Sequence, residues 1–191
     1  MDQLKKVPEH LASPIDNIFY RLSDIICPSM KVSGWTPNMI TTVGLVFGLI
    51  SIYLIYTEDY FLGLIFLWLC FFSDCLDGHF ARKYDMVTKF GDYYDHFRDI
   101  FVVVSVIILI YKKLRKPKRR IFFVVVTCIF AYLMMVQIGC QEQNSSFPEH
   151  NDCLDIFKKL CPNPELIIYT RFFGCGTFMF VLSLFLLYLT S

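Results

Sequence analysis

Long apolar runs alternate with short polar segments along this chain. Several of the runs approach the roughly 20 residues that an α-helix needs to cross a bilayer. The period-two alternation of a membrane β-barrel is absent, which leaves helices as the way to cross lipid. The pattern therefore predicts an all-α integral membrane protein that forms one domain over residues 1–191. We expect its transmembrane helices at about 38–56, 61–80, 91–111, 121–138 and 166–190.

An amphipathic helix is expected before the first span, over residues 13–30. Ser13 and Pro14 are typical of a helix start, because serine caps the first N–H groups and proline fits the first helical position. Apolar residues then recur at helical spacing, and polar residues lie off this stripe. Such a helix is too polar to cross the bilayer, and we expect it to lie in the membrane interface. Packing of the stripe on another protein is the alternative.

The second and third runs become long enough to cross only if they include charged residues. The apolar part of the second run ends at Phe72, and that of the third begins at Ile100. At a rise of about 1.5 Å per residue, neither part alone crosses the membrane. The stretch between them, "SDCLDGHFARKYDMVTKFGDYYDHFRDI", therefore belongs partly to both helices. Its aspartates are expected at membrane depth or just inside the membrane edge.

Composition agrees with a membrane protein and says little about partners. The chain is 55% hydrophobic and 18% charged, with a mean hydropathy of +0.51. Soluble domains usually carry about a quarter charged residues. The net charge is +1, and basic residues do not interleave with aromatic ones on a soluble face, so nucleic acid is not an expected partner. The polar N-terminus predicts no cleaved signal peptide.

The eight cysteines have the spacing of neither a zinc site nor a disulfide framework. We expect most of them to be small apolar filler within or beside the helices. Cys140, Cys153 and Cys161 share one polar loop and could pair if that loop faced an oxidising lumen. No such pair is expected.

Aspartates between the second and third runs recur at helical spacing. Asp74 and Asp77 are three residues apart, and Asp95 and Asp99 are four apart, so each pair shares a helix face. Carboxylates that face one another repel or take up protons unless a cation lies between them. Oxygen ligands favour Mg²⁺ or Mn²⁺ over zinc. The pattern therefore predicts a site for one or two divalent cations.

Three further residues extend this cation site into a site for a diphosphate. Gly78 leaves room for a ligand to approach closely, and Arg82 is a natural partner for a phosphate. Gly91 opens the next helix, whose N-terminal end favours anions. Carboxylates, a metal, an arginine and two glycines together indicate diphosphate binding.

The same stretch resembles the signature of the CDP-alcohol phosphotransferase family. That signature reads Asp, two residues, Asp-Gly, two residues, Ala-Arg, eight residues, Gly, three residues, Asp, three residues, Asp. The segment "TPNMIT" is similar to the Pro-Asn-x-x-Thr segment with which the family begins its first span. The resemblance covers the interfacial helix and the first three spans well, and the remainder loosely. The fixed positions of the signature are filled here by Asp74, Asp77, Gly78, Ala81, Arg82, Gly91, Asp95 and Asp99.

The resemblance implies a membrane enzyme of phospholipid synthesis that transfers a phospho-group from a CDP-linked donor to an alcohol and releases CMP. It implies two Mg²⁺ or Mn²⁺ ions, with Asp99 also acting as the general base. Arg171, in the last span, could bind a phosphate of the donor or acceptor, or could reach to the membrane surface. The implied metal ligands are Asp74, Asp77, Asp95 and Asp99. The residues implied to contact the CDP donor are Pro37, Asn38, Thr41, Gly78, Arg82, Thr88 and Gly91.

Four nearby polar residues lie outside the signature. Asp85 and Asp92 are expected to be solvated, or to support the site without binding metal. His79 and His96 are expected to form hydrogen bonds around the site and not to act in catalysis.

Two donor classes fit the resemblance. A CDP-diacylglycerol donor with a polyol acceptor, such as inositol or glycerol phosphate, is favoured by the short chain and by "YTR" in the last span. A choline- or ethanolamine-phosphotransferase reaction on diacylglycerol is favoured by "DH" at 95–96. A cation transporter or channel would use the carboxylates but not the glycines and Arg82. An inactive scaffold would not need the intact acidic positions.

The family usually has six spans, one more than expected here, and a homodimer partner could compensate. Its site usually faces the cytosol, so we expect a cytosolic site in an endomembrane like that of the endoplasmic reticulum. The basic segment "KKLRKPKRR" at 112–120 would then lie on the opposite side, against the positive-inside rule. The sequon at Asn144 would share the cytosolic side with the site, where it is not glycosylated.

Overall fold

The computed structural model describes residues 7–8, 10–145 and 155–190. Within these residues the chain is helical and contains no strand, which confirms the predicted all-α fold class. Cys153 lies outside the described residues. So does Ser146, which is the last residue of the sequon that begins at Asn144. The α-helices are α1 (Pro14–Val32), α2 (Pro37–Tyr56), α3 (Tyr60–Lys83), α4 (Lys89–Lys113), α5 (Pro117–Gln143), α6 (Asp155–Lys158), α7 (Ile167–Thr170) and α8 (Cys175–Thr190). Two 3₁₀ turns, η2 (Pro164–Leu166) and η3 (Arg171–Phe173), flank α7.

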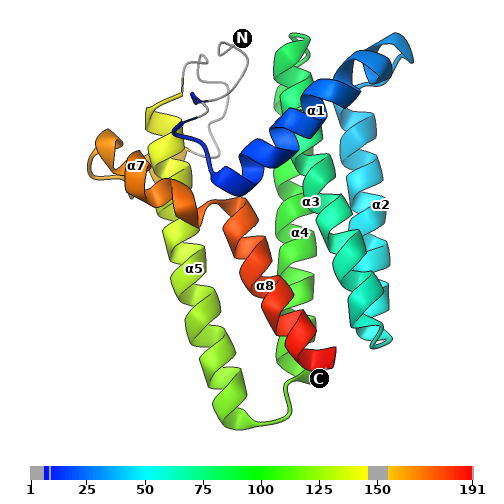
Figure 1. The fold of residues 1–191 in the computed structure, drawn as a ribbon, viewed down its shortest axis with the longest axis vertical. Helices are drawn as coiled ribbons and strands as arrows, with labels where there is room; N and C mark the ends of the chain where they lie inside the picture. The colour runs from blue at the N-terminus through cyan, green and yellow to red at the C-terminus, as the bar shows by residue number, and fades with distance from the viewer. Residues whose placement is uncertain (1–6, 9, 146–154, 191) are drawn as a thin grey trace.

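Five long helices pack side by side, and α1 lies across one end of the bundle (Figure 1). Helix α2 packs against α3 and α4, α8 packs against the same two helices, and α5 packs against α8. The core is made of apolar side chains that are almost fully buried. It holds α3 and α4, the helices that carry the aspartates. Its most deeply buried members include Ile55, Leu67, Val106, Phe123 and Leu182.

Small residues on one face of α2 let it approach α3 and α4 closely. A Cβ at Gly48 would lie 2.5 Å from Cγ2 of Val102 on α4, and a Cβ at Gly44 would lie 3.0 Å from Cβ of Ser73 on α3. Small residues at helix contacts allow this kind of packing in membrane proteins. Helix α2 therefore fixes the positions of both helices that carry the signature.

Four helical stretches of the described residues are long and apolar enough to cross a membrane. They are α2, α3, α5 and the stretch Pro164–Leu189. Helix α4 has 25 residues and packs beside them, but it carries charged residues near both ends. A multi-pass membrane protein is therefore supported, while the fifth span at α4 and the single domain over 1–191 stay predictions.

The predicted last span at 166–190 corresponds to the apolar stretch Pro164–Leu189, whose helix is interrupted at one point. The chain breaks at Gly174, which is extended with ψ of −179°, and α8 begins at Cys175. Helix α8 has 16 residues, a length of about 24 Å at the usual rise per residue. Arg171 lies in η3, within the apolar stretch Pro164–Leu189. Apolar composition predicts the span but does not reveal where its helix is interrupted.

Contacts with α1 explain the break. A Cβ at Gly174 would lie 2.8 Å from Cβ of Ser13, and a Cβ at Gly176 would lie 2.7 Å from Oδ1 of Asp16. The N–H of Gly176 donates to Oδ1 of Asp16 at 3.2 Å. An acidic side chain at the start of a helix is favourable because of the helix dipole. Helix α8 therefore begins where the first turn of α1 meets it.

Helix α1 packs both polar and apolar residues onto the bundle and turns other apolar residues outward. Asp16 is buried, and Asp24 accepts a hydrogen bond from Nζ of Lys83 on α3 at 2.8 Å. Ile18 and Ile25 are 60% and 73% exposed. The predicted helix is confirmed, and its exposed apolar face suits lipid. Its position in the membrane interface stays a prediction.

A disulfide bond joins Cys140, near the end of α5, to Cys161. The expectation that no such pair forms was therefore wrong. The chain after α5 folds back against it, and Nε2 of Gln143 donates to the carbonyls of Lys158 and Cys161. This return of the chain is a tertiary feature, which cysteine spacing alone does not reveal. The bond ties the segment before α7 to the end of α5.

Candidate active site

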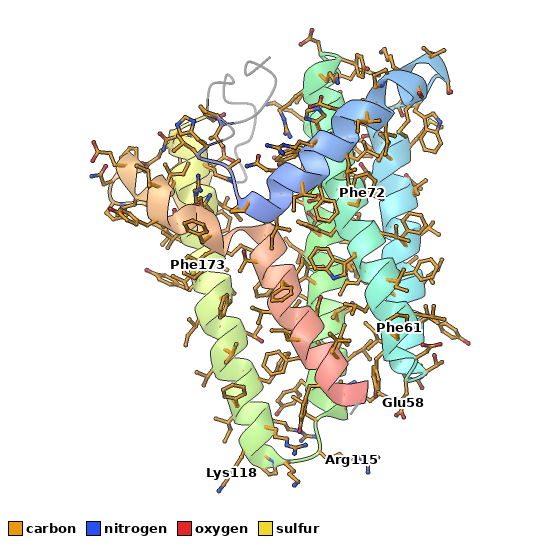
Figure 2. The ribbon with its side chains drawn as sticks, in the orientation of Figure 1. Glu58, Phe61, Phe72, Arg115, Lys118 and Phe173 are labelled. Carbon is orange, nitrogen blue, oxygen red and sulfur yellow. A yellow bond between two sulfur atoms is a disulfide. The ribbon has the colours of Figure 1, made fainter. Side chains whose placement is uncertain are left out.

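The signature residues meet at the end of the bundle that α1 covers. Helix α3 runs towards α1 and α4 runs away from it, so the end of α3 and the start of α4 are neighbours (Figure 1). Figure 2 labels Glu58, Arg115 and Lys118 at the opposite end. There Nζ of Lys113 on α4 forms an ion pair with Glu58 at 2.6 Å. The carboxylates and the basic turn therefore lie at opposite ends of the molecule.

Three of the predicted metal ligands form a compact group. Asp74, Asp95 and Asp99 each offer a carboxylate oxygen, and these oxygens lie within 4.8 Å of one another. Asp77, one turn after Asp74, is almost fully buried and accepts a hydrogen bond from Oγ1 of Thr41 at 2.7 Å. The structure therefore brings the four signature aspartates together, as their helical spacing predicts.

Arg98 lies among all four carboxylates, and sequence reasoning missed it. Its side chain is fully buried. Nη2 lies 2.6 Å from an oxygen of each of Asp74, Asp95 and Asp99, and Nη1 lies 2.9 Å from Asp77. The signal available in the sequence was its position three residues after Asp95, which places both side chains on one helix face.

The donor set fits a hard divalent cation. All four side chains offer carboxylate oxygens, the ligands that Mg²⁺ and Mn²⁺ prefer. Oδ1 of Asp95 is buried and accepts no hydrogen bond within the described part of the chain. Nη2 of Arg98 has two N–H groups, and these donate to Asp74 and Asp99. Asp95 therefore keeps an oxygen that a metal ion would satisfy.

Residues expected to contact the donor gather where α2 and α4 begin. Pro37 is the first residue of α2, and Thr88 caps α4 by accepting the N–H of Gly91 at 3.1 Å. A Cβ at Gly91 would lie 2.9 Å from Oδ1 of Asn38, so the two helix starts touch. Thr41 faces the carboxylates through its bond to Asp77. Contact of these residues with a donor stays a prediction.

Arg82 lies along α3 against the glycine of its own signature. A Cβ at Gly78 would lie 3.3 Å from Nη1 of Arg82, one turn away. Nε of Arg82 is buried without a hydrogen-bond partner in the described part of the chain. A buried donor without a partner is costly unless a ligand supplies an acceptor. This is what the predicted phosphate contact requires.

The two histidines bond to groups other than the signature aspartates. Nε2 of His79 lies 2.8 Å from Oδ1 of Asp24, and Nδ1 of His96 lies 2.7 Å from the carbonyl of Asp92. Burial raises the pKa of Asp24, but the hydrogen bonds from Lys83 and His79 outweigh it and hold that pKa below its usual value. His79 therefore helps to attach α1 to α3. Asp85 is exposed, as expected.

Arg171 contacts the N-terminal segment. Its Nη1 donates to the carbonyl of His10, and its guanidinium lies 4.9 Å from the ring centroid of Phe172. These contacts place it beside the chain that enters α1. Binding of a donor or acceptor phosphate by Arg171 stays a prediction.

Comparisons with known proteins identify the family. The model of the family described as CDP-alcohol phosphatidyltransferase matches residues 34–150. The archaetidylinositol phosphate synthase of Pyrococcus horikoshii is 32% identical over 92 residues, 48% of this chain and 45% of the relative. The CDP-diacylglycerol–glycerol-3-phosphate 3-phosphatidyltransferase of Rickettsia prowazekii is 32% identical over 87 residues, 44% of this chain and 48% of the relative.

The chain thus spans about half the length of these curated relatives. No solved structure shows significant similarity to it. The family match covers more than half of the chain and includes every signature position. The chain belongs to the CDP-alcohol phosphatidyltransferase family.

Proposed function

We propose that this protein transfers a phosphatidyl or phospho-alcohol group from a CDP-linked donor to an alcohol, with release of CMP. The observation that carries the proposal is the convergence of four signature aspartates from α3 and α4. Family membership supports the same reaction class. A divalent cation, Mg²⁺ or Mn²⁺, bound to these carboxylates would neutralise the negative charge of the diphosphate and of the leaving CMP.

Asp99 is the residue best placed to take the proton of the acceptor. Its side chain is 42% exposed, more than those of Asp74, Asp77 and Asp95, at 24%, 4% and 25%. A general base must reach the hydroxyl that it deprotonates. In the proposed step the acceptor oxygen forms a bond to the donor phosphorus and its proton passes to Asp99. The bond from that phosphorus to the bridging oxygen breaks, and CMP leaves with that oxygen.

Residues around the carboxylates would position the donor. Arg82 has a buried N–H available for a phosphate oxygen, and the start of α4 presents its first N–H groups at Gly91. Asn38 and Thr41 would border the nucleotide from the start of α2. Positioning and electrostatic stabilisation account for most of what such a transfer needs from a protein.

CDP-diacylglycerol is the donor that we propose, with a polyol or polyol phosphate as acceptor. The names of the two curated relatives, an archaetidylinositol phosphate synthase and a glycerol-3-phosphate phosphatidyltransferase, support a polyol acceptor. The choline- or ethanolamine-type reaction on diacylglycerol is the alternative within the family. The expected homodimer stays a prediction, since no described feature bears on it.

We propose an endomembrane location, and the fold bears on which side the site faces. The basic turn at 112–120 and the carboxylates lie at opposite ends, and the Cys140–Cys161 disulfide lies at the carboxylate end, because α5 runs away from the basic turn. Basic loops favour the cytosol, and disulfides favour an oxidising compartment. Both features support a lumenal carboxylate end, against the cytosolic side that the family resemblance implies.

A panel of donors and acceptors tests the proposed reaction. Purified protein would be incubated with Mn²⁺ or Mg²⁺, one CDP-linked donor and one alcohol, and the lipid product identified by mass spectrometry. We expect a new phosphatidyl-polyol lipid from CDP-diacylglycerol. A product only from CDP-choline or CDP-ethanolamine with diacylglycerol would establish the alternative. No product from any pair would favour a cation-binding membrane protein without this activity.

A further inference from the structure

We propose that Arg98 takes the place of one divalent cation, so that the site binds a single Mg²⁺ or Mn²⁺ ion and not the two that the family resemblance implies. The inference rests on the proposed function, since it concerns the cations of the same site. It starts from one contact. Nη2 of Arg98 lies 2.6 Å from each of the three carboxylates whose oxygens form the compact ligand group.

Helix α2 provides a place for the guanidinium of Arg98. A Cβ at Gly44 would lie 3.2 Å from Nη1 and 3.7 Å from Cδ of Arg98, so the absence of a side chain at this position makes room. Asp77 pairs with Nη1 and is itself held by Thr41 of α2. Arg98 is thus enclosed by three helices and fully buried. These features indicate a permanent component of the site, not a surface side chain that has turned inward.

Charge balance favours one further cation. The four carboxylates carry four negative charges, and Arg98 neutralises one of them. One divalent ion would leave a single negative charge, whereas two would leave net positive charge beside a buried guanidinium. Like charges repel strongly at such short separation when solvent is excluded. A single ion satisfies the carboxylates without this repulsion.

The hydrogen bonds of Arg98 leave a ligand available for that single ion. Nη2 donates its two N–H groups to Asp74 and Asp99. Oδ1 of Asp95 lies 2.6 Å from the same nitrogen but accepts no hydrogen bond within the described residues. The guanidinium therefore supplies one positive charge to the carboxylates without satisfying every ligand oxygen. A metal ion would complete the set.

Mn²⁺ binding to the purified full chain, without any CDP donor, tests this proposal. Calorimetry should give one Mn²⁺ per wild-type chain, with the electron paramagnetic resonance spectrum of an isolated ion. Arg98→Gln, which removes the charge but keeps N–H donors, should bind two. Its spectrum should show spin coupling, because the ions of a two-metal site lie about 3.5–4 Å apart. Arg98→Lys, which keeps the charge, and Lys113→Ala, at the far end of α4, should both bind one.

Two Mn²⁺ ions in the wild type, none in the wild type, or one in Arg98→Gln would each overturn the proposal. If Arg98→Gln does not fold, the wild type and Arg98→Lys decide, since two ions in either contradicts it and one in both supports it. The result is separate from that of the proposed function. A chain that binds one Mn²⁺ but releases no CMP refutes the function alone. A chain that releases CMP with two ions bound refutes this inference alone.

Discussion

The signature aspartates differ in how far their side chains are exposed. Asp77 is nearly inaccessible and is fixed by Thr41 and Arg98. Asp99 is the most exposed of the four carboxylates, although Nε and Nη2 of Arg98 both donate to it. A substrate hydroxyl can therefore reach Asp99 more readily than Asp77. This difference supports Asp99 as the base and Asp77 as a fixed ligand.

Replacing Asp99 tests its role as the base. We expect Asp99→Asn to lower CMP release by at least about 10²-fold, because general-base catalysis contributes this much or more. Donor binding, measured by titration with a non-reacting CDP-lipid analogue, should change little. Asp85→Asn, at an exposed position outside the signature, should release CMP at the wild-type rate. Full activity in Asp99→Asn would contradict the assignment.

The sequence predicted that the four aspartates form one site, but it did not predict that Arg98 lies among them. Helical spacing places Asp74 with Asp77 and Asp95 with Asp99, and this depends only on neighbours along each helix. Burial of Arg98 depends on Gly44, which comes from another helix. An arginine three residues after an aspartate usually forms a solvated pair of little energetic value. Its central position was therefore not predictable from local spacing.

At the scale of elements, the docking of α1 depends on a buried carboxylate. Burial raises the pKa of Asp16 from 3.8 to about 7, and the hydrogen bond from the N–H of Gly176 offsets only part of this effect. The folded state therefore binds the proton more tightly than the unfolded state. The stability that proton binding to Asp16 contributes is therefore fully present below about pH 4 and falls as the pH rises towards 7.

The melting temperature of the detergent-solubilised protein, followed by tryptophan fluorescence from pH 4 to 8, tests this linkage. The contribution of Asp16 should fall with pH by at most about 1.4 kcal/mol per unit. Asp16→Asn should lose the pH dependence that Asp16 contributes. Its melting temperature relative to that of the wild type should therefore rise between pH 4 and 7. Asp85→Asn should follow the wild-type profile. Parallel profiles for Asp16→Asn and the wild type would show that Asp16 is not buried as described.

Close packing of α2 against α4 makes a second prediction about elements. A Cβ at Gly48 would lie 2.5 Å from Cγ2 of Val102, so Gly48→Ala should destabilise the protein by about 1–3 kcal/mol through overpacking. Adding Val102→Ala should recover part of the loss by making room. Val46→Ala, at an exposed position on α2, is the matched control. An unchanged melting temperature in Gly48→Ala would contradict this contact.

Helix boundaries show which parts of each element follow from sequence. The expected span at 38–56 agrees with α2, because Thr36 and Pro37 provide a local start signal. The break at Gly174 depends on contact with Ser13 and Asp16, more than 150 residues earlier in the chain. The same holds for the Cys140–Cys161 disulfide, which requires the chain to fold back after α5. Local patterns predict helices, but the break at Gly174 and the disulfide depend on tertiary contacts.

At the scale of the whole molecule, the opposite placement of the basic turn and the carboxylates predicts orientation. A glycosylation acceptor tag inserted after Arg115, in the basic turn, should stay unmodified in endoplasmic reticulum membranes. The same tag inserted after Gln143, the last residue of α5 at the carboxylate end, should be glycosylated. The expected reason is the positive-inside rule. Modification of the tag in the basic turn alone would establish the cytosolic site implied by the family resemblance.

The measurement that tests the central claim most directly is CMP release by the purified chain. The reaction would contain CDP-diacylglycerol, a polyol or polyol phosphate acceptor and Mn²⁺ or Mg²⁺, and CMP would be quantified by chromatography. We predict CMP and the phosphatidyl-polyol product in equal amounts, with loss of both after chelation of the metal and in Asp99→Asn. Failure of every CDP-linked donor to yield CMP, or release that continues unchanged after chelation, would contradict the account.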